Sequence, residues 1–138
     1  MALDLRQDIF QPVSARVRKR ADSLTNVMCF ANSGIEGWFK VEIVAALGDR
    51  IQKLQNKGAD LKLTDGTEIE IKAATNFSKY WCITDPVQKY GGPVMFLAGG
   101  ADPEKLRSTK DDSFEIVACE EFSTGTHHWL IGMVKPRS

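Results

Sequence analysis

Residues 58–74 constrain the fold of this chain more than any other stretch, because they have the pattern of a β-hairpin with one charged face. Leu and Ile alternate there with charged residues at a period of two, which is typical of half-buried strands. Residues 64–66, Thr-Asp-Gly, separate the two runs. A three-residue hairpin loop places a left-handed residue last, and Gly66 suits that position. The stretch therefore predicts two antiparallel strands joined by this loop.

The loop length fixes the register of the two strands, and the register decides which side chains share a face. A three-residue loop pairs Leu61 with Ile69 and Asp60 with Glu70, and directly opposed residues share a face. The apolar face then consists of Leu61, Leu63, Ile69 and Ile71. The charged face consists of Asp60, Lys62, Glu68, Glu70 and Lys72. A two-residue loop would slip the register by one residue and mix the faces, so the pattern excludes it.

The predicted register brings two carboxylates, Asp60 and Glu70, side by side, with Lys72 two residues further along the same face. Carboxylate pairs bind hard cations such as Mg²⁺ through oxygen, and a Lys beside them can hold or activate a water. The alternative is a face that is simply solvated and salt-bridged, as charged sheet exteriors usually are. Ala73 and Ala74 favour the first interpretation, because they continue the strand into small apolar residues that fit a covered position.

This arrangement resembles the active-site signature of the PD-(D/E)xK phosphodiesterases, which include type II restriction enzymes and Holliday-junction resolvases. The residues that carry the resemblance are Asp60 and, after nine intervening residues, Glu70, Ile71 and Lys72. Ala59 stands where the Pro of the family name would be, a departure that many members share. The resemblance covers residues 34–98 and implies a restriction-endonuclease-like αβββαβ core, an α/β fold with a mixed central sheet flanked by helices. It also implies a metal-dependent endonuclease acting on DNA.

The resemblance further implies a role for each residue of the signature. Asp60, Glu70 and the Ile71 carbonyl would ligate Mg²⁺ or Mn²⁺. Lys72 would orient the attacking water and stabilise the charge that builds on the phosphoryl oxygens. Members of the family also often carry a Glu on the first helix that reaches the same metal site.

Glu42 is the candidate for this helix position. Residues 35–47 predict a helix that is apolar over most of its circumference and therefore buried, and Glu42 lies in the middle of its apolar stripe. A carboxylate is costly there unless it is paired or bound to metal. We therefore expect Glu42 to point toward Asp60 and Glu70, whereas Glu36 falls on the solvent side with Lys40. The alternative is a buried Glu42 paired with an Arg or Lys.

Composition and charge limit the classes of protein to which this chain can belong. A chain of 138 residues is one domain with a sizeable core. Its 18 basic and 18 acidic residues give a net charge of zero, which argues against tight nonspecific coating of DNA. The three cysteines are far apart and form no CxxC, so a reducing cytoplasm fits better than a disulfide framework or a zinc site. No signal peptide or membrane-spanning run is expected.

Within this single domain, residues 1–33 predict a helical lead-in, residues 34–98 the nuclease-like core with the catalytic hairpin, and residues 99–138 a C-terminal helix and strand pair. Arg16, Lys19 and Arg20 recur at helical spacing, which fits a phosphate-contacting helix or a merely solvated face. Residues 49–57 fit either a helical segment or a short strand. Further strands are expected at residues 80–83, 93–100, 114–122 and 128–135, and short helices are expected to begin at Asp85 and Asp102.

The leading hypothesis is a Mg²⁺-dependent endodeoxyribonuclease whose partner is nucleic acid, with no membrane. A homodimer is expected because a small nuclease that cuts both strands commonly works as a symmetric pair, and because Trp38, Trp81 and Trp129 need covering. Two alternatives stay open. One is a catalytically inactive domain of the same fold that binds or assembles, and the other is an unrelated α/β domain whose charged hairpin face is solvated.

Overall fold

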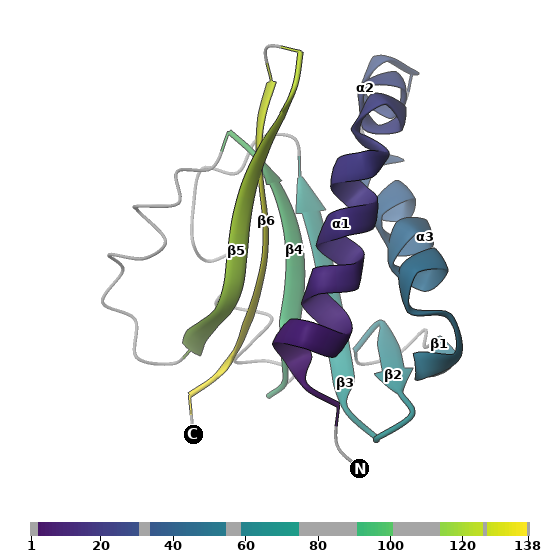
Figure 1. Cartoon of the computed structure of the whole chain (residues 1–138), viewed down its shortest axis with the longest axis vertical. Coiled ribbons are helices and arrows are strands. Elements are labelled where there is room, and N and C mark those ends of the chain that lie inside the picture. The colour runs from purple at the N-terminus through teal and green to yellow at the C-terminus, as the bar shows by residue number, and fades with distance from the viewer. Residues whose placement is uncertain are drawn as a thin grey trace.

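A computed structural model of the chain describes residues 3–30, 34–54, 59–74, 91–100, 114–125 and 127–137. In this part of the chain, six strands form one mixed sheet in the order β1-β2-β3-β4-β6-β5. Helices α1, α2 and α3 lie together on one side of that sheet (Figure 1). The predicted α/β class with a mixed central sheet is therefore confirmed. None of the helices in the described part is long and apolar enough to cross a membrane.

The N-terminal part of the chain supplies the helical layer. Its elements are η1 (a π-helix, Leu5–Phe10), α1 (Gln11–Lys19), α2 (Ala21–Phe30), α3 (Ile35–Leu47) and η3 (a 3₁₀ helix, Gly48–Arg50). The Asp4 carboxylate caps η1 by accepting hydrogen bonds from the backbone N–H groups of Arg6 and Gln7, both at 2.9 Å. Gly48 has a φ of 52°, which ends α3 where the sequence predicts.

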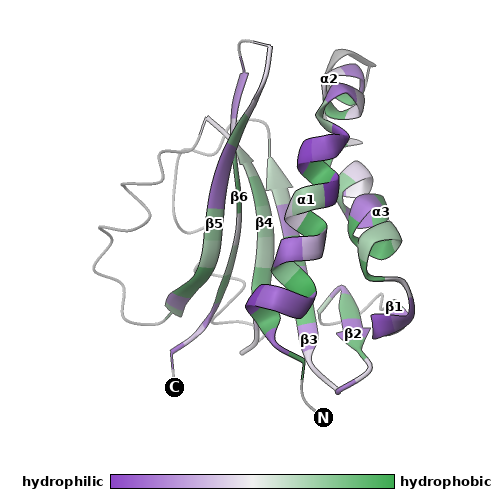
Figure 2. Cartoon of the chain, in the orientation of Figure 1, coloured by the Kyte–Doolittle hydropathy of each residue, from purple (hydrophilic) through white to green (hydrophobic). Residues whose placement is uncertain are grey.

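The helix α3 covers the sheet with one side and faces solvent with the other. Its buried residues are Ile35, Phe39, Glu42, Ile43 and Leu47. Val41 and Val44 are 65% and 37% exposed, so the expectation of a helix buried all round is wrong. In Figure 2, α1 shows both hydrophilic and hydrophobic colours along its length, as expected for an amphipathic helix that covers a sheet.

The central hairpin has the predicted register. Strands β2 (Leu61–Leu63) and β3 (Glu68–Ala74) are antiparallel, with Leu61 opposite Ile69. The Leu63 N–H donates to the Thr67 carbonyl at 2.8 Å, and Gly66 has a φ of 93°, which confirms the three-residue loop. The four residues of the predicted apolar face are all buried in one core cluster with α1 and α3. One residue beyond the last ladder pair, the same register places Asp60 opposite Glu70.

The strands on either side of this hairpin complete the sheet. Strand β1 (Ile51–Leu54) pairs with β2 at the sheet edge, so the first part of residues 49–57 is a 3₁₀ turn followed by a strand. Strand β4 (Val94–Gly99) runs parallel to β3 and is buried throughout, as expected. The elements expected at residues 80–83, at Asp85 and at Asp102 lie outside the described residues.

A long C-terminal hairpin forms the other half of the sheet. Strands β5 (Phe114–Thr124) and β6 (His127–Pro136) are antiparallel, and β6 lies next to β4, which confirms the predicted strand pair. Gly132 in β6 lies opposite Phe96 in β4. A Cβ atom at Gly132 would come within 2.4 Å of the Phe96 ring. The sheet therefore accommodates this ring only because residue 132 has no side chain.

Both faces of the sheet around β4 are buried, and this decides the surroundings of the charged hairpin residues. The face away from the helices carries a second apolar cluster of Val94, Phe96, Ala98, Phe114, Leu130 and Val134. In the parallel pair, Glu70 lies beside Val94 and Lys72 beside Phe96. Since neighbouring side chains of paired strands share a face, Glu70 and Lys72 lie on this apolar face. The carboxylate at position 70 is therefore covered and not washed by solvent.

Candidate metal site

Asp60 and Glu70 meet at the end of the β2–β3 ladder. Asp60 directly precedes β2, and Glu70 lies in β3 with 6% of its surface exposed. A hydrogen bond joins the two carboxyl groups. The second Asp60 oxygen, Oδ2, accepts a hydrogen bond from the Ile71 N–H at 2.8 Å. The structure thus brings together the two carboxylates that the hairpin register predicts.

The backbone of Ile71 faces the same place. The Glu70 N–H donates to the Pro93 carbonyl at 3.0 Å on the β4 side, so the Ile71 N–H points the other way, toward Asp60. In a strand, the N–H and C=O of one residue point to the same side. The Ile71 carbonyl therefore also lies on the Asp60 side, beyond the end of β2. Two carboxyl groups and one carbonyl form a set of oxygen donors there.

The two carboxyl groups have opposite pKa shifts. Burial and the neighbouring Asp60 raise the pKa of Glu70 to about 8. Burial also opposes ionisation of Asp60, but hydrogen bonds from Glu70, Lys40 and the Ile71 N–H outweigh it and lower the pKa of Asp60. At neutral pH, Glu70 is therefore mainly protonated and Asp60 ionised, and the pair carries about one negative charge. Ionisation of both adjacent carboxyl groups is unfavourable, because their like charges repel.

One oxygen of this pair lacks a partner. Glu70 Oε2 is buried and has no hydrogen-bond partner among the described residues. A buried polar atom of this kind costs free energy unless something binds it. Oxygen donors suit hard cations such as Mg²⁺ and Mn²⁺, so the residues fit the metal that the resemblance implies. The described residues contain no group of three or more His, Cys, Asp or Glu side chains that could hold a metal ion, so among them the acidic part of the site is this pair.

Lys72 adds a positive charge to the site from β3. Its side chain is half-buried on the same sheet face as Glu70. Its charge acts to lower the pKa of Glu70, against the effects of burial and of Asp60. The structure therefore places Lys72 where the sequence predicts it, within electrostatic reach of the carboxyl pair.

Lys40 is a site residue that the sequence analysis missed. Its Nζ lies 2.8 Å from Asp60 Oδ1. This hydrogen bond raises the pKa of Lys40 despite partial burial, and the charges of Asp60, Glu36 and Glu70 contribute in the same direction. A signal was present, because Lys40 is the single basic residue in residues 35–47, on the helix that precedes the hairpin. The helix side that carries Glu36 and Lys40 is the side that faces the site.

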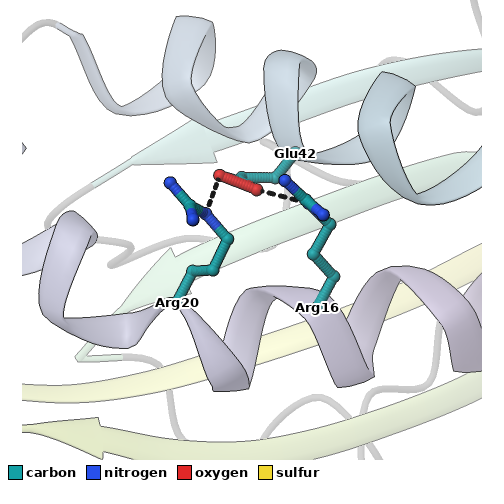
Figure 3. A network of polar contacts seen from close by, with 3 residues as sticks. All are labelled: Arg16, Arg20 and Glu42. Atoms are coloured by element: carbon teal, nitrogen blue, oxygen red, sulfur yellow. Dashed lines mark hydrogen bonds and ion pairs between the residues drawn. The ribbon is translucent and has the colours of Figure 1, made fainter.

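Glu42 lies on another side of α3 and has different partners. Its Oε2 accepts from Arg16 Nε at 2.7 Å and its Oε1 from Arg20 Nε at 2.6 Å (Figure 3). Positions 40 and 42 are about 200° apart around a helix. Because Lys40 reaches Asp60, Glu42 turns toward α1. The expectation that Glu42 points toward Asp60 and Glu70 is therefore wrong, and the alternative of a buried Glu paired with arginine is confirmed.

The arginines of α1 and of its C-cap accordingly contribute to the packing of the helical layer. Arg16 and Arg20 tie α1 to α3 through Glu42. Arg18 forms an ion pair with Glu120 of β5 at 3.0 Å, and the buried Ser14 hydroxyl donates to the same carboxylate at 2.9 Å. Arg16 and Arg20 share the single Glu42 carboxylate, so the merely solvated face is wrong for these two residues, and phosphate contact by this helix stays a prediction.

Replacing Glu42 with Gln is expected to lower the free energy of unfolding by about 1–3 kcal/mol, the range for a lost buried hydrogen bond to a charged group. The change keeps the side-chain shape but leaves Arg16 and Arg20 facing each other without a carboxylate. Urea unfolding measures the effect. Glu36→Gln is the matched control on the same helix, away from both arginines, and should stay within about 0.5 kcal/mol of the wild type. A Glu42→Gln protein as stable as the wild type would contradict this role.

Comparisons with protein-family models, with curated proteins and with solved structures found no match to this chain. What the site can do is therefore inferred from its own chemistry. It offers a buried pair of carboxyl groups, of which one oxygen has no partner among the described residues, and a backbone carbonyl on the same side. It also offers two lysines, Lys40 from α3 and Lys72 from β3.

Proposed function

We propose that this protein is a metal-dependent phosphodiesterase that cleaves DNA, with Asp60, Glu70 and the Ile71 carbonyl as the ligands of Mg²⁺ or Mn²⁺. The observation that carries the proposal is the carboxyl group of Glu70. It is buried, next to a second acid, and its Oε2 has no partner among the described residues. Strongly shifted acids in such positions are more typical of functional sites than of structural ones.

The order of the elements supports a restriction-endonuclease-like core. Helix α3 is followed by three antiparallel strands, β1, β2 and β3, and then by β4, which is parallel to β3. This is the order of the αβββαβ core without its second helix. The segment between β3 and β4, where that core has its second helix, lies for the most part outside the described residues. The carboxyl pair lies at the end of the β2–β3 ladder that is remote from the connecting loop, at the two strands where the signature of the family would place it.

The proposed chemistry divides the work among the residues of the site. A bound divalent cation would neutralise the charge that develops on the phosphoryl and leaving oxygens. The Ile71 N–H fixes the orientation of Asp60 through Oδ2, which leaves Oδ1 as the oxygen that would bind the cation. Lys72 holds the attacking water through its ammonium group and stabilises the negative charge of the transition state.

The two alternatives make different predictions for the same residues. A solvated, salt-bridged hairpin face would leave Glu70 exposed, and its burial counts against that interpretation. A catalytically inactive domain of the same fold would keep metal binding without cleavage.

Self-association also stays a prediction. Trp129 does not need a partner chain, since it is fully buried and its Nε1 donates to Thr124 Oγ1 at 2.9 Å.

Nicking of supercoiled plasmid tests the proposal directly. We expect cleavage with Mg²⁺ or Mn²⁺ that stops in excess chelator, and we expect Asp60→Asn to reduce it to background because one ligand charge is lost. Glu68→Gln is the matched control, since Glu68 is an exposed acid on β3 of the same hairpin. Mn²⁺ should also raise the melting temperature of the wild type by mass action. Stabilisation without cleavage of DNA or RNA would indicate the inactive domain, and the absence of both would remove the metal site.

A further inference from the structure

We infer that Lys40 is the resident counter-ion of this site, and that its ammonium group must leave Asp60 before a divalent cation can bind. The inference rests on the proposed function, since it concerns the same carboxyl pair. It adds a residue from α3 that competes with the metal and then becomes free to contact the substrate.

The geometry of Asp60 places the two cations in competition for one oxygen. Oδ2 is held by the Ile71 N–H at 2.8 Å, and Oδ1 is held by Lys40 Nζ at 2.8 Å. The oxygen that the backbone leaves available is therefore the one that Lys40 occupies. A divalent cation on Oδ1 would lie within contact distance of the ammonium group, and two positive charges that close repel strongly in a partly buried site.

Lys40 has the freedom to move away. Its side chain is 41% exposed, and its stem of four methylene groups is flexible. Glu36 lies one turn earlier on the same helix side and already attracts the Lys40 charge, so it offers a second partner. Lys40 and Asp60 also line a surface groove of about 530 Å³ whose walls include Val41 and Leu54. A displaced ammonium group therefore has both a partner and space, and it stays close enough to meet a substrate phosphate.

The consequence is that Lys40 lowers the affinity of the site for metal while stabilising the metal-free protein. Lys40→Met keeps the length of the stem and removes the charge. We expect this variant to bind Mn²⁺ about tenfold more tightly than the wild type, because the cation no longer has to break a charge-assisted hydrogen bond. Without metal, the same variant should be no more stable than the wild type, since Asp60 has lost its counter-ion. Its melting temperature should therefore rise more on addition of Mn²⁺.

Isothermal titration calorimetry with Mn²⁺, together with thermal melting, tests this inference without an activity measurement. Lys62→Met is the matched control, because Lys62 lies on β2 of the same hairpin and is paired in the ladder with Glu68, and it should keep the wild-type affinity. Lys40→Gln provides a second neutral side chain, and circular dichroism verifies the fold of each variant. Tighter binding by both Lys40 variants supports the inference.

Two other outcomes would overturn it, and they differ in what they imply for the proposed function. If the wild type binds Mn²⁺ and both Lys40 variants bind it equally or more weakly, Lys40 does not compete with the metal, and the metal site stands. If neither the wild type nor the Lys40 variants bind Mn²⁺, both the inference and the proposed metal site are wrong.

Discussion

Lys72→Ala is expected to lower the rate of DNA cleavage by about 10²–10³, the usual loss when one group that stabilises transition-state charge is removed. Binding of Mn²⁺ should remain nearly unchanged, because Lys72 is not a ligand in the proposed site. We expect the loss of rate because Lys72 lies on the same sheet face as Glu70, where its charge already acts on that carboxyl group. Single-turnover nicking kinetics at saturating Mn²⁺ measure the rate, and calorimetry measures the affinity.

Lys62→Ala is the control for this substitution, since it removes the same charge from the neighbouring strand at a position that the ladder pairs with Glu68 and not with Glu70. It should change the rate less than about threefold, as expected for a surface position outside the site. A fully active Lys72→Ala protein would assign the water-orienting role to another group. A Lys72→Ala protein that no longer binds Mn²⁺ would instead mean that Lys72 is needed to form the metal site.

Raising the pH from about 5 to about 9 without metal is expected to destabilise the protein by a few kcal/mol. The pKa of Glu70 is about 8, above its ordinary value of 4.5, so between these values the folded state binds a proton that the unfolded chain releases. The free energy of unfolding then falls as pH rises, by up to about 1.4 kcal/mol per pH unit. The lowered pKa of Asp60 and the raised pKa of Lys40 act outside this window, at lower and higher pH respectively.

Urea unfolding in chelator across this range measures the slope, and Glu70→Gln identifies its origin. Gln mimics the protonated acid at every pH, so the variant should show a flat profile and exceed the wild type in stability near pH 9. Mn²⁺ should also flatten the wild-type profile, because a bound cation favours the ionised carboxylate. Equal slopes for the wild type and Glu70→Gln would mean that another group causes the pH dependence.

These expected effects share one physical feature, which is that the carboxyl pair costs stability in the metal-free fold. Glu70 is buried beside apolar residues of β4, with one oxygen unpartnered among the described residues. A neutral side chain at this position would satisfy the packing better than an acid does. Folds usually retain such a cost where activity needs it. The gain in stability expected for Glu70→Gln and the loss of activity expected for Asp60→Asn have one cause: the carboxyl pair that the proposed activity needs destabilises the metal-free fold.

The sequence by itself determined the local elements and the register of the hairpin. The alternation of apolar and charged residues at a period of two specifies two strands, and the loop at residues 64–66 leaves one pairing that keeps the faces separate. That pairing places Asp60 beside Glu70. The end of α3 could also be predicted from the sequence, because Gly48 follows a long apolar helix and ends it. These features depend on neighbours within a few residues along the chain, and such neighbours are visible in a sequence.

Only the tertiary structure decided which side chains from separate elements meet. Periodicity shows that Glu42 belongs to the buried side of α3, but not which element covers that side. Because α1 packs against α3, Glu42 pairs with Arg16 and Arg20, which are more than 20 positions away in the chain. The same rotation of α3 turns Lys40 toward Asp60. The rotation of a helix about its axis and the choice of its neighbours come from the packing of the whole core, and no local pattern encodes them.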